Sequence, residues 1–343
     1  MYKFSLQKSS IKHLCPNCGK KRFVLYIDVE TENFISPEVG RCDREVNCGY
    51  HYPPKLFFQD NNQKYVSIVD NTIPVSSFEE EYHYHTSEEL NKSLTNFDKN
   101  NLIQFLETKI NCEKVQKMIF EYKIGTAQNW YNGTVFWQID VEQKIRGGKI
   151  ISYDHLGKRT KYINWMHSIN LKQNKIEEFK LNQCFFGEHL LQKYEKIIAI
   201  VESEKTASIM SMLFNKYLWL ATGSLNGLTL KKIQVLKDRK IILYPDLGID
   251  GLNGSPFSIW KTKCDQFKKA GFDIEISNLL EQNGTDYDKE NGFDLADYFL
   301  RNLDKKIKKI ITQKEQIILE MYMKNKNLKT LIDVFELTEA NER

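Results

Sequence analysis

The sequence predicts an α/β protein built on a parallel sheet with helical crossovers, preceded by a mixed α+β subdomain and a small four-cysteine zinc β-ribbon. Three observations predict this. Four of the seven cysteines lie within the first 48 residues, aromatic and β-branched runs surround glycine turns between residues 130 and 165, and short apolar runs alternate with amphipathic stretches after about residue 184. With 343 residues, 41% hydrophobic and 27% charged, the chain has the length of about two ordinary globular domains.

Composition also limits the cellular setting. No run approaches about 18 apolar residues and the N-terminus lacks the apolar stretch of a secretory signal, so we expect a cytoplasmic protein with no membrane partner. A net charge of +4 is too small to indicate a nucleic-acid partner by itself. Cys112, Cys184 and Cys264 are scattered singly, which favours free thiols beside a metal site over disulfides.

Changes in composition and hydrophobic pattern along the chain predict five segments. They are a zinc ribbon (1–58), a linker and helical segment (59–125), a basic subdomain (126–183), the parallel-sheet domain (184–302) and a C-terminal helical tail (303–343). Pro53 and Pro54 end the ribbon, because adjacent prolines discourage a helix or a central strand. Hairpin turns are expected at Asn132-Gly133, Gly147-Gly148 and residues 154–157.

The ribbon prediction rests on cysteine spacing. Cys15 and Cys18 form Cys-x2-Cys, and after a spacer of 23 residues Cys42 and Cys48 form Cys-x5-Cys. Two tight turns with glycines can place four thiolates tetrahedrally around Zn²⁺, and a closed site of this kind is structural. The alternatives are a metal-free set of thiols, or His51 in place of Cys48.

Basic side chains accompany the ribbon. They could bind phosphates while Phe23 and Tyr26 stack on bases, or they could form a solvated face, and the residues alone favour neither. The residues concerned are Lys20, Lys21, Arg22, Arg41 and Arg44.

In the second half, acidic residues follow two predicted strands. Glu202 comes directly after the run 196–201, and Asp246 follows the run 239–245, with Asp250 four residues on. Carboxyl ends of parallel strands are where ligands bind, and two such carboxylates can hold Mg²⁺ or Mn²⁺. The simpler interpretations are a charge near a helix N-terminus for Glu202 and a turn residue for Asp246.

Four motifs in order resemble one known domain. The sequence VESEKTAS at 201–208 is followed by ATGSLNGL at 221–228, YPDLGID at 244–250 and FDLADYF at 293–299. This order is similar to the Toprim domain of bacterial-type primases, topoisomerases and some nucleases. With a four-cysteine ribbon in front, the chain most resembles the primase-like proteins of mobile elements and phages.

The resemblance implies roles for these acids. Glu202 matches the strand-end glutamate of acid–base or metal chemistry, and Asp246 matches the first Asp of an Asp-x-Asp pair. The second position of that pair is Gly248, a departure that puts catalytic competence in doubt. The candidates to replace the missing acid are Asp250, Asp294 and Asp297, of which the last two would share a helix face at i, i+3.

The segment 144–161 carries six Lys or Arg and one acid. A loop at Gly147-Gly148 would bring two cations to a phosphate, and the resemblance implies that this region holds nucleotide phosphates and template. The alternative is a basic hairpin edge that deters aggregation. The candidate binding residues are Arg146, Lys149, Lys158, Arg159 and, at the helix after Glu202, Lys205; Tyr153, Tyr162, Trp165 and His167 supply nearby rings.

The function implied by the resemblance is the synthesis of short RNA primers on single-stranded DNA from nucleoside triphosphates, with Mg²⁺ or Mn²⁺ at the acidic site. A second hypothesis is a catalytically weakened nucleic-acid-binding adaptor for mobile-element replication that positions a helicase or relaxase. A Toprim nuclease is a third and weaker hypothesis. A topoisomerase is disfavoured because the chain has no room for strand-passage domains.

Overall fold

The computed structural model describes residues 3–7, 11–29, 31–44, 48–61, 82–251 and 254–302, with Met321 and Asn325. The chain divides into two units, Met1–Leu295 and Ala296–Arg343. Most of the predicted tail at 303–343, and the linker at 62–81, lie outside the described residues. Among the residues described, no helix is long and apolar enough to cross a membrane.

The N-terminal β-ribbon is an antiparallel sheet. Its strands are β1 (Phe4–Leu6), β2 (His13–Leu14), β3 (Lys21–Asp28), β4 (Gly40–Cys42) and β5 (His51–Tyr52), in the order β1-β3-β4-β5 with β2 also paired to β3. Phe23 and Leu25 of β3 pack against the cysteines in its small core. The expected break at Pro53-Pro54 was wrong, because α1 (Pro54–Asp60) follows at once. Pro54 takes the first helical position, where its fixed φ suits a helix.

Short helices precede the second sheet. They are α2 (Ser87–Ser93), η1 (Phe97–Lys99), α3 (Asn101–Lys109) and α4 (Cys112–Tyr122). A capping box between Thr86 and Glu89 starts α2. The apolar side chains of Leu102, Ile103 and Leu106 on α3 are fully buried.

The second sheet is antiparallel, with β6 (Ile124–Ala127), β7 (Gly133–Ile139), β8 (Ile145–Tyr153) and β9 (Arg159–Trp165) in sequence order, followed by α5 (Met166–Lys172). Tyr131 and Asn132 both have positive φ (54° and 46°), which makes the β6–β7 turn type I′.

The expected turn at Gly147-Gly148 was wrong, because both glycines lie inside β8, opposite Gln138 and Trp137. A Cβ on Gly148 would lie 2.7 Å from Met166 and 2.8 Å from Trp137. These glycines therefore allow close packing within the sheet and do not form a phosphate loop.

The third sheet is the predicted parallel one. It comprises β10 (Ile197–Val201), β11 (Tyr217–Ala221), β12 (Ile241–Leu243) and β13 (Ile274–Ile276), in the order β11-β10-β12-β13, and every pair is parallel. The connections contain α6 (Glu204–Leu213), then η3 (Leu225–Gly227), α7 (Leu230–Ile233) and η4 (Gln234–Leu236), then α8 (Pro256–Lys269). After β13 come α9 (Leu279–Asn283) and α10 (Asp286–Glu290), and η2 (Glu188–Gln192) precedes β10.

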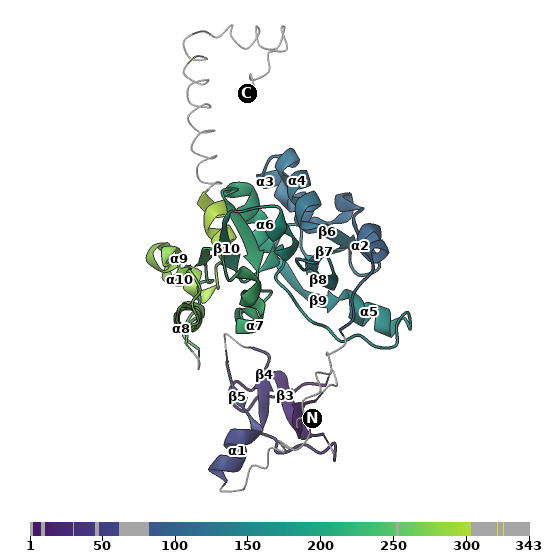
Figure 1. Cartoon of the computed structure of the whole chain (residues 1–343), viewed down its shortest axis with the longest axis vertical. Coiled ribbons are helices and arrows are strands. Elements are labelled where there is room, and N and C mark those ends of the chain that lie inside the picture. The colour runs from purple at the N-terminus through teal and green to yellow at the C-terminus, as the bar shows by residue number, and fades with distance from the viewer. Residues whose placement is uncertain are drawn as a thin grey trace. The chain divides into compact units, whose positions relative to one another are not determined.

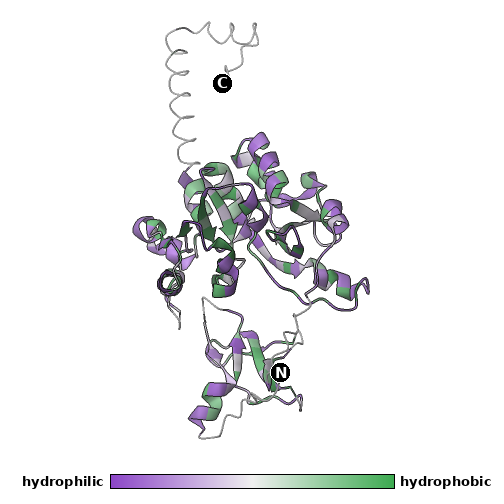
Figure 2. Ribbon diagram, in the orientation of Figure 1, coloured by the Kyte–Doolittle hydropathy of each residue, from purple (hydrophilic) through white to green (hydrophobic). Residues whose placement is uncertain are grey.

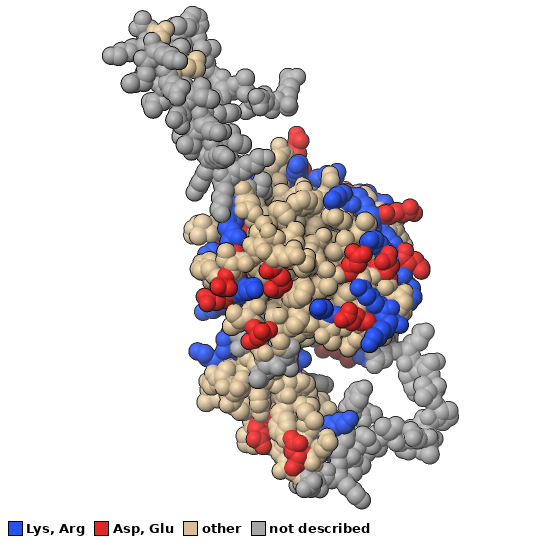
Figure 3. Space-filling view, turned by 90° about the vertical axis from the view of Figure 1, so that its left-hand side faces the viewer, with Lys and Arg blue, Asp and Glu red and all other residues tan. Residues whose placement is uncertain are grey.

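The antiparallel β6–β9 sheet and the parallel β10–β13 sheet lie side by side in the first unit (Figure 1), and their strands are mostly hydrophobic (Figure 2). Phe186, just before η2, bridges to Ala221 of β11 and contacts the rings of Phe136 and Tyr122. The buried Tyr122 hydroxyl also donates to the Trp219 carbonyl at 2.9 Å. On the face shown in Figure 3, acidic and basic side chains of the described residues are intermixed, in keeping with the small net charge.

Candidate functional site

The four ribbon cysteines form one cluster. Their Sγ atoms all lie within 4.8 Å of one another, with Cys15 and Cys48 3.6 Å apart and Cys18 and Cys42 4.0 Å apart. Tetrahedral coordination with Zn–S bonds of about 2.3 Å requires sulfur separations of about 3.8 Å. Three of the four residues are buried, so the donor set fits a closed site for Zn²⁺.

The turns that carry the cysteines explain the spacing. Gly19 and Gly49 each follow the second cysteine of a pair and have φ of +63° and +64°, a conformation that favours glycine. His51 is not in the cluster and instead bonds the Tyr26 hydroxyl through Nε2 at 2.9 Å. Phe23 is 0% exposed, so its ring is not available to stack on bases.

The strand order of the parallel sheet brings two predicted carboxylates to the same edge. From β10 the chain crosses to β11 on one side, whereas β12 and β13 lie on the other side, so the order reverses between β10 and β12. In open parallel sheets, the crevice at the carboxyl ends of such a strand pair is the usual ligand site. Glu202 follows β10 and Asp246 follows β12, so both predicted carboxylates reach this crevice.

Glu202 and Asp246 are close neighbours. The backbone N–H of Asp246 donates to Oε1 of Glu202 at 3.4 Å, and the Glu202 side chain is buried. Among the described residues of the first unit, the four cysteines are the only group of three or more possible metal ligands within 4.8 Å of one another. The expected convergence of three carboxylates is therefore not seen there, and the observed link between Glu202 and Asp246 is the backbone hydrogen bond from Asp246 to the Glu202 carboxylate.

The other acidic candidates differ in their surroundings. Asp294 is buried and accepts a 2.6 Å hydrogen bond from Thr206 on α6, and next to it the Phe293 carbonyl accepts from Leu247 N–H. Asp294 thus lies on a segment that borders the Asp246 loop. Asp250 is exposed on that loop, and Asp297 lies in the second unit. Asp294 precedes the helix at 295–302, so it does not share a helical turn with Asp297 as expected.

Lys149, a predicted phosphate ligand, links the antiparallel β6–β9 sheet to the parallel-sheet domain. Its ammonium lies 3.1 Å from both carboxylate oxygens of Glu204, the first residue of α6, and 2.8 Å from the carbonyl of Gly223 after β11. The side chains of Lys149 and Glu204 are 13% and 1% exposed. Lys149 therefore holds the start of α6 and the end of β11 against β8.

Arg146 belongs to a second buried group at the same junction. Its Nε lies 2.5 Å from Oδ2 of Asp140, whose side chain is 1% exposed. Nearby, burial raises the pKa of Glu188 to about 7, and burial lowers the pKa of Lys232. Lys232 donates to the Thr222 carbonyl at 3.0 Å. Arg146 and Lys149 therefore each form an ion pair with a buried carboxylate of this chain.

The remaining predicted cations are more open. Lys158 and Arg159 are exposed where the β8–β9 turn enters β9, and Lys205 is half-buried in the first turn of α6. Of the predicted rings, Tyr153 is buried, while Tyr162 is 39% exposed.

Comparisons with known proteins cover the chain in two parts. A family model described as "Zinc beta-ribbon finger, putative" matches residues 2–63, where the cysteine cluster lies. The predicted zinc ribbon is confirmed. A second model, described as "Domain of unknown function (DUF6371)", matches residues 100–247, which span the antiparallel sheet and the parallel sheet as far as the Asp246 loop. No curated protein matches significantly.

Two solved structures are similar to this chain at low identity. One is the primase fragment of the bacteriophage T7 primase-helicase protein, with 14% identity, a TM-score of 0.34, and coverage of 83% of this chain and 98% of that one. The other is the Aquifex aeolicus primase, zinc-binding and RNA polymerase domains, with 11% identity, a TM-score of 0.41, and coverage of 95% and 85%.

Sequence reasoning missed several residues around these sites. Glu204 and Thr206 lie within the motif after β10, but their partners Lys149 and Asp294 are 55 and 88 residues away, so local spacing carries no signal for them. Helix α2 was missed within a polar segment, although its capping box at Thr86 and Glu89 was a readable signal.

Proposed function

We propose that this chain is a primase-like nucleotidyltransferase that makes short RNA primers on single-stranded DNA. In this proposal residues 184–302 are a Toprim-type domain, residues 126–183 are the basic subdomain in front of it, and the zinc ribbon grips the template. The observation that carries it is the contact between Glu202 and Asp246 in the crevice where the strand order reverses. The ordered Toprim-like motifs of the sequence support the same site.

The pair fits a divalent cation. Mg²⁺ binds protein through one or two carboxylates and completes its shell with water and substrate phosphates, so two carboxylates at one crevice are sufficient. Glu202 and Asp246 would hold Mg²⁺ or Mn²⁺, which supplies neutralisation of charge on the reacting phosphates. Asp250, Asp294 and Asp297 remain candidates for an additional ligand.

The chain's own side chains would position the substrates. Lys205 projects from the helix that starts beside Glu202, so it is the nearest predicted cation for a triphosphate. Lys158 and Arg159 are exposed and would contact the template backbone. We propose that Lys149 acts at this site chiefly by holding the antiparallel and parallel sheets together, and that Arg146 supports the β7–β8 hairpin through Asp140, since both cations are bound to buried carboxylates.

A second candidate function is a nucleic-acid-binding adaptor that has lost efficient catalysis and positions a helicase or relaxase. Two observations favour it over a nuclease: Gly248 replaces the second acid of the Asp-x-Asp pair, and among the described residues of the first unit no three carboxylates gather within 4.8 Å of one another.

A priming assay tests the proposal. Purified protein is incubated with single-stranded DNA, labelled ribonucleotides and Mg²⁺ or Mn²⁺, and the products are separated on a gel. We expect short oligoribonucleotides from the wild type, and a loss of at least about 100-fold in Glu202→Gln and Asp246→Asn, because each removes one charge without changing side-chain size. Gln can still accept the hydrogen bond from Asp246 N–H.

The matched control is Glu275→Gln, which removes an exposed carboxylate from the edge strand β13 and should leave priming unchanged. DNA binding without any product in the wild type would replace the primase proposal with the adaptor. Full activity in both crevice variants would show that the assignment of the site is wrong.

A further inference from the structure

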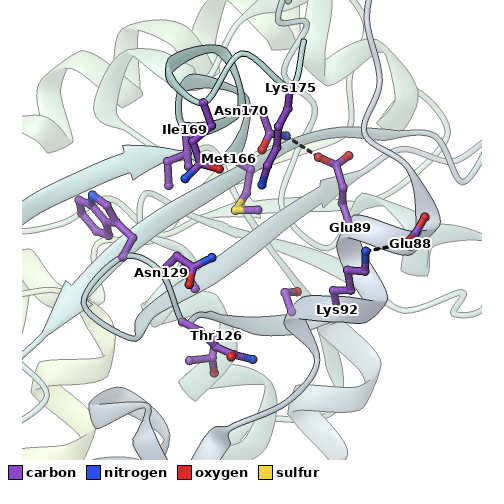
Figure 4. A pocket seen from close by; sticks show the side chains of 14 residues that line it. Glu88, Glu89, Lys92, Thr126, Asn129, Met166, Ile169, Asn170 and Lys175 are labelled. Atoms are coloured by element: carbon purple, nitrogen blue, oxygen red, sulfur yellow. Dashed lines mark hydrogen bonds and ion pairs between the residues drawn. The ribbon is translucent and has the colours of Figure 1, made fainter.

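A cavity of about 520 Å³ lies in the antiparallel-sheet part of the chain, away from the carboxylate pair. Its walls come from α2, the segment after β6, and α5 with the residues that follow it (Figure 4). Clefts that hold small molecules in proteins typically have about 300–1,000 Å³, so this cavity has room for one nucleotide-sized group. None of its lining residues belongs to the zinc ribbon or to the acidic crevice.

Part of the cavity lining is apolar and packs on the core. Ala127, Trp130, Met166 and Ile169 line the cavity, and they pack on the hydrophobic cluster that contains Trp137. Side chains held by a packed core keep their positions when a ligand enters, which lowers the ordering cost of binding. This wall suits the flat apolar face of a ring.

Amide side chains from the same two segments, the loop after β6 and α5 with the residues that follow it, make up much of the remaining lining. Gln128, Asn129, Asn170 and Gln173 line the cavity, and each amide offers both a donor and an acceptor. Glu89 orients one of them, because the Asn170 amide donates to its carboxylate. The hydrogen bond with His85 lowers the pKa of Glu89 to about 2, so Glu89 stays ionised at neutral pH. Paired donors and acceptors beside a flat apolar wall match the edge of a nucleobase.

The two lysines of the lining differ in how available they are to a phosphate, and the more available one is exposed at the rim of the cavity. Lys92 is neutralised by Glu88 at 2.6 Å. Lys175, which projects toward the cavity in Figure 4, is exposed and makes no ion pair with any residue that the structure describes. It is therefore the cation of this lining that is most open to a phosphate.

An exposed aromatic platform, formed by Tyr131 and Tyr162, adjoins the cavity. The two rings are stacked at 4.6 Å and are 65% and 39% exposed. Both rings contact the edge of Trp130, the aromatic residue of the cavity wall, at 5.4 and 6.4 Å. The ammonium of Lys161 lies 5.3 Å from the Tyr162 ring. Exposed rings beside cations are the usual surface on which unpaired bases stack.

We propose that this cavity binds a single nucleobase, with its phosphate toward Lys175 and a neighbouring base stacked on Tyr131. The base can come from single-stranded DNA or from a free nucleotide, since both present the same ring and phosphate. Binding here does not require the carboxylate pair or Mg²⁺, so it is independent of the proposed polymerisation.

The test is equilibrium binding to the full-length protein without Mg²⁺. One probe is a fluorescein-labelled 12-nucleotide single-stranded DNA of mixed sequence, followed by anisotropy, and the other is a set of four ribonucleoside monophosphates, followed by calorimetry. Tyr131→Ala should weaken DNA binding about 5- to 100-fold, the range for losing one base–aromatic stack. Asn129→Ala and Lys175→Ala should each weaken binding of whichever probe enters the cavity by about 3- to 10-fold.

Matched controls separate the site from general effects. Lys172→Ala removes an exposed like charge at the end of α5, three residues before Lys175, and Tyr287→Ala removes a ring that is 64% exposed on α10. Both should bind like the wild type. Far-ultraviolet circular dichroism and urea unfolding of every variant report whether the fold is intact.

The two probes distinguish the sources. Weakening of DNA binding alone identifies a base of the strand as the occupant, and weakening of monophosphate binding alone identifies a free nucleotide; either supports the proposal. The proposal is overturned if the wild type binds neither probe. It is also overturned if the folded Asn129 and Lys175 variants bind both probes as the wild type does.

Discussion

Replacing Lys149 by Met should destabilise the core strongly. The substitution keeps the length of the side chain but removes the ammonium that contacts Glu204 at 3.1 Å and the Gly223 carbonyl at 2.8 Å. Glu204 is 1% exposed and would be left as a buried charge without its cation. Removing one partner of such a pair costs about 3–5 kcal/mol, a large part of the roughly 5–15 kcal/mol that stabilises an ordinary domain.

Urea unfolding followed by circular dichroism measures this loss, and thermal unfolding should show a midpoint lower by about 6–20 °C. The double variant Lys149→Met, Glu204→Gln should recover most of the stability, because no unpaired charge remains. The matched control, Lys158→Met, removes an exposed lysine and should change stability by less than about 0.5 kcal/mol. A loss below about 1 kcal/mol in Lys149→Met, or no recovery in the double variant, would refute the reasoning.

Two further predictions concern the metal and pH. Elemental analysis should find about one Zn²⁺ per chain. The metal should be lost in Cys42→Ser but kept in Cys264→Ser, because the Cys264 thiol is buried outside the cysteine cluster. Equal zinc contents in the two variants would argue against the cluster as the site. Burial raises the pKa of Glu188 from 4.5 to about 7, so its contribution to stability is complete below about pH 4.5 and is lost as pH rises through 7. Glu188→Gln should therefore reduce the fall in unfolding free energy between pH 5 and 8 by up to about 3 kcal/mol, and an unchanged pH profile would contradict a buried titrating carboxyl.

Elements with a clear local period could be predicted from the sequence. The apolar runs that became β10 to β13 are short and rich in β-branched or aromatic residues, and the segments between them have the length of crossover helices. The cysteine pairs were equally readable, because Gly19 and Gly49 allow the left-handed turns that such knuckles need. In these cases the signal lies within a few residues of the feature it predicts.

Predictions that depended on residues far away in the sequence were less successful. Gly147 and Gly148 resemble a turn in the sequence, yet in β8 they leave space for Trp137 and Met166, which lie 11 and 18 residues from Gly148 on other elements. Lys149 resembles a phosphate ligand until Glu204 is seen 3.1 Å away. Neither neighbour can be recognised from the local sequence, because strand pairing and sheet packing create both contacts.

The amino-acid sequence alone determined the metal ribbon, the alternation of strands and helices, and the presence of an acid after each of two strands. Only the tertiary structure decided that β10 lies beside β12, which brings Glu202 and Asp246 together, and that segments from α2 to α5 enclose a cavity lined by amides. The physical reason is that backbone geometry repeats over two to four residues, whereas these sites depend on contacts between residues 40 or more positions apart, and such contacts are set by the packing of the whole core.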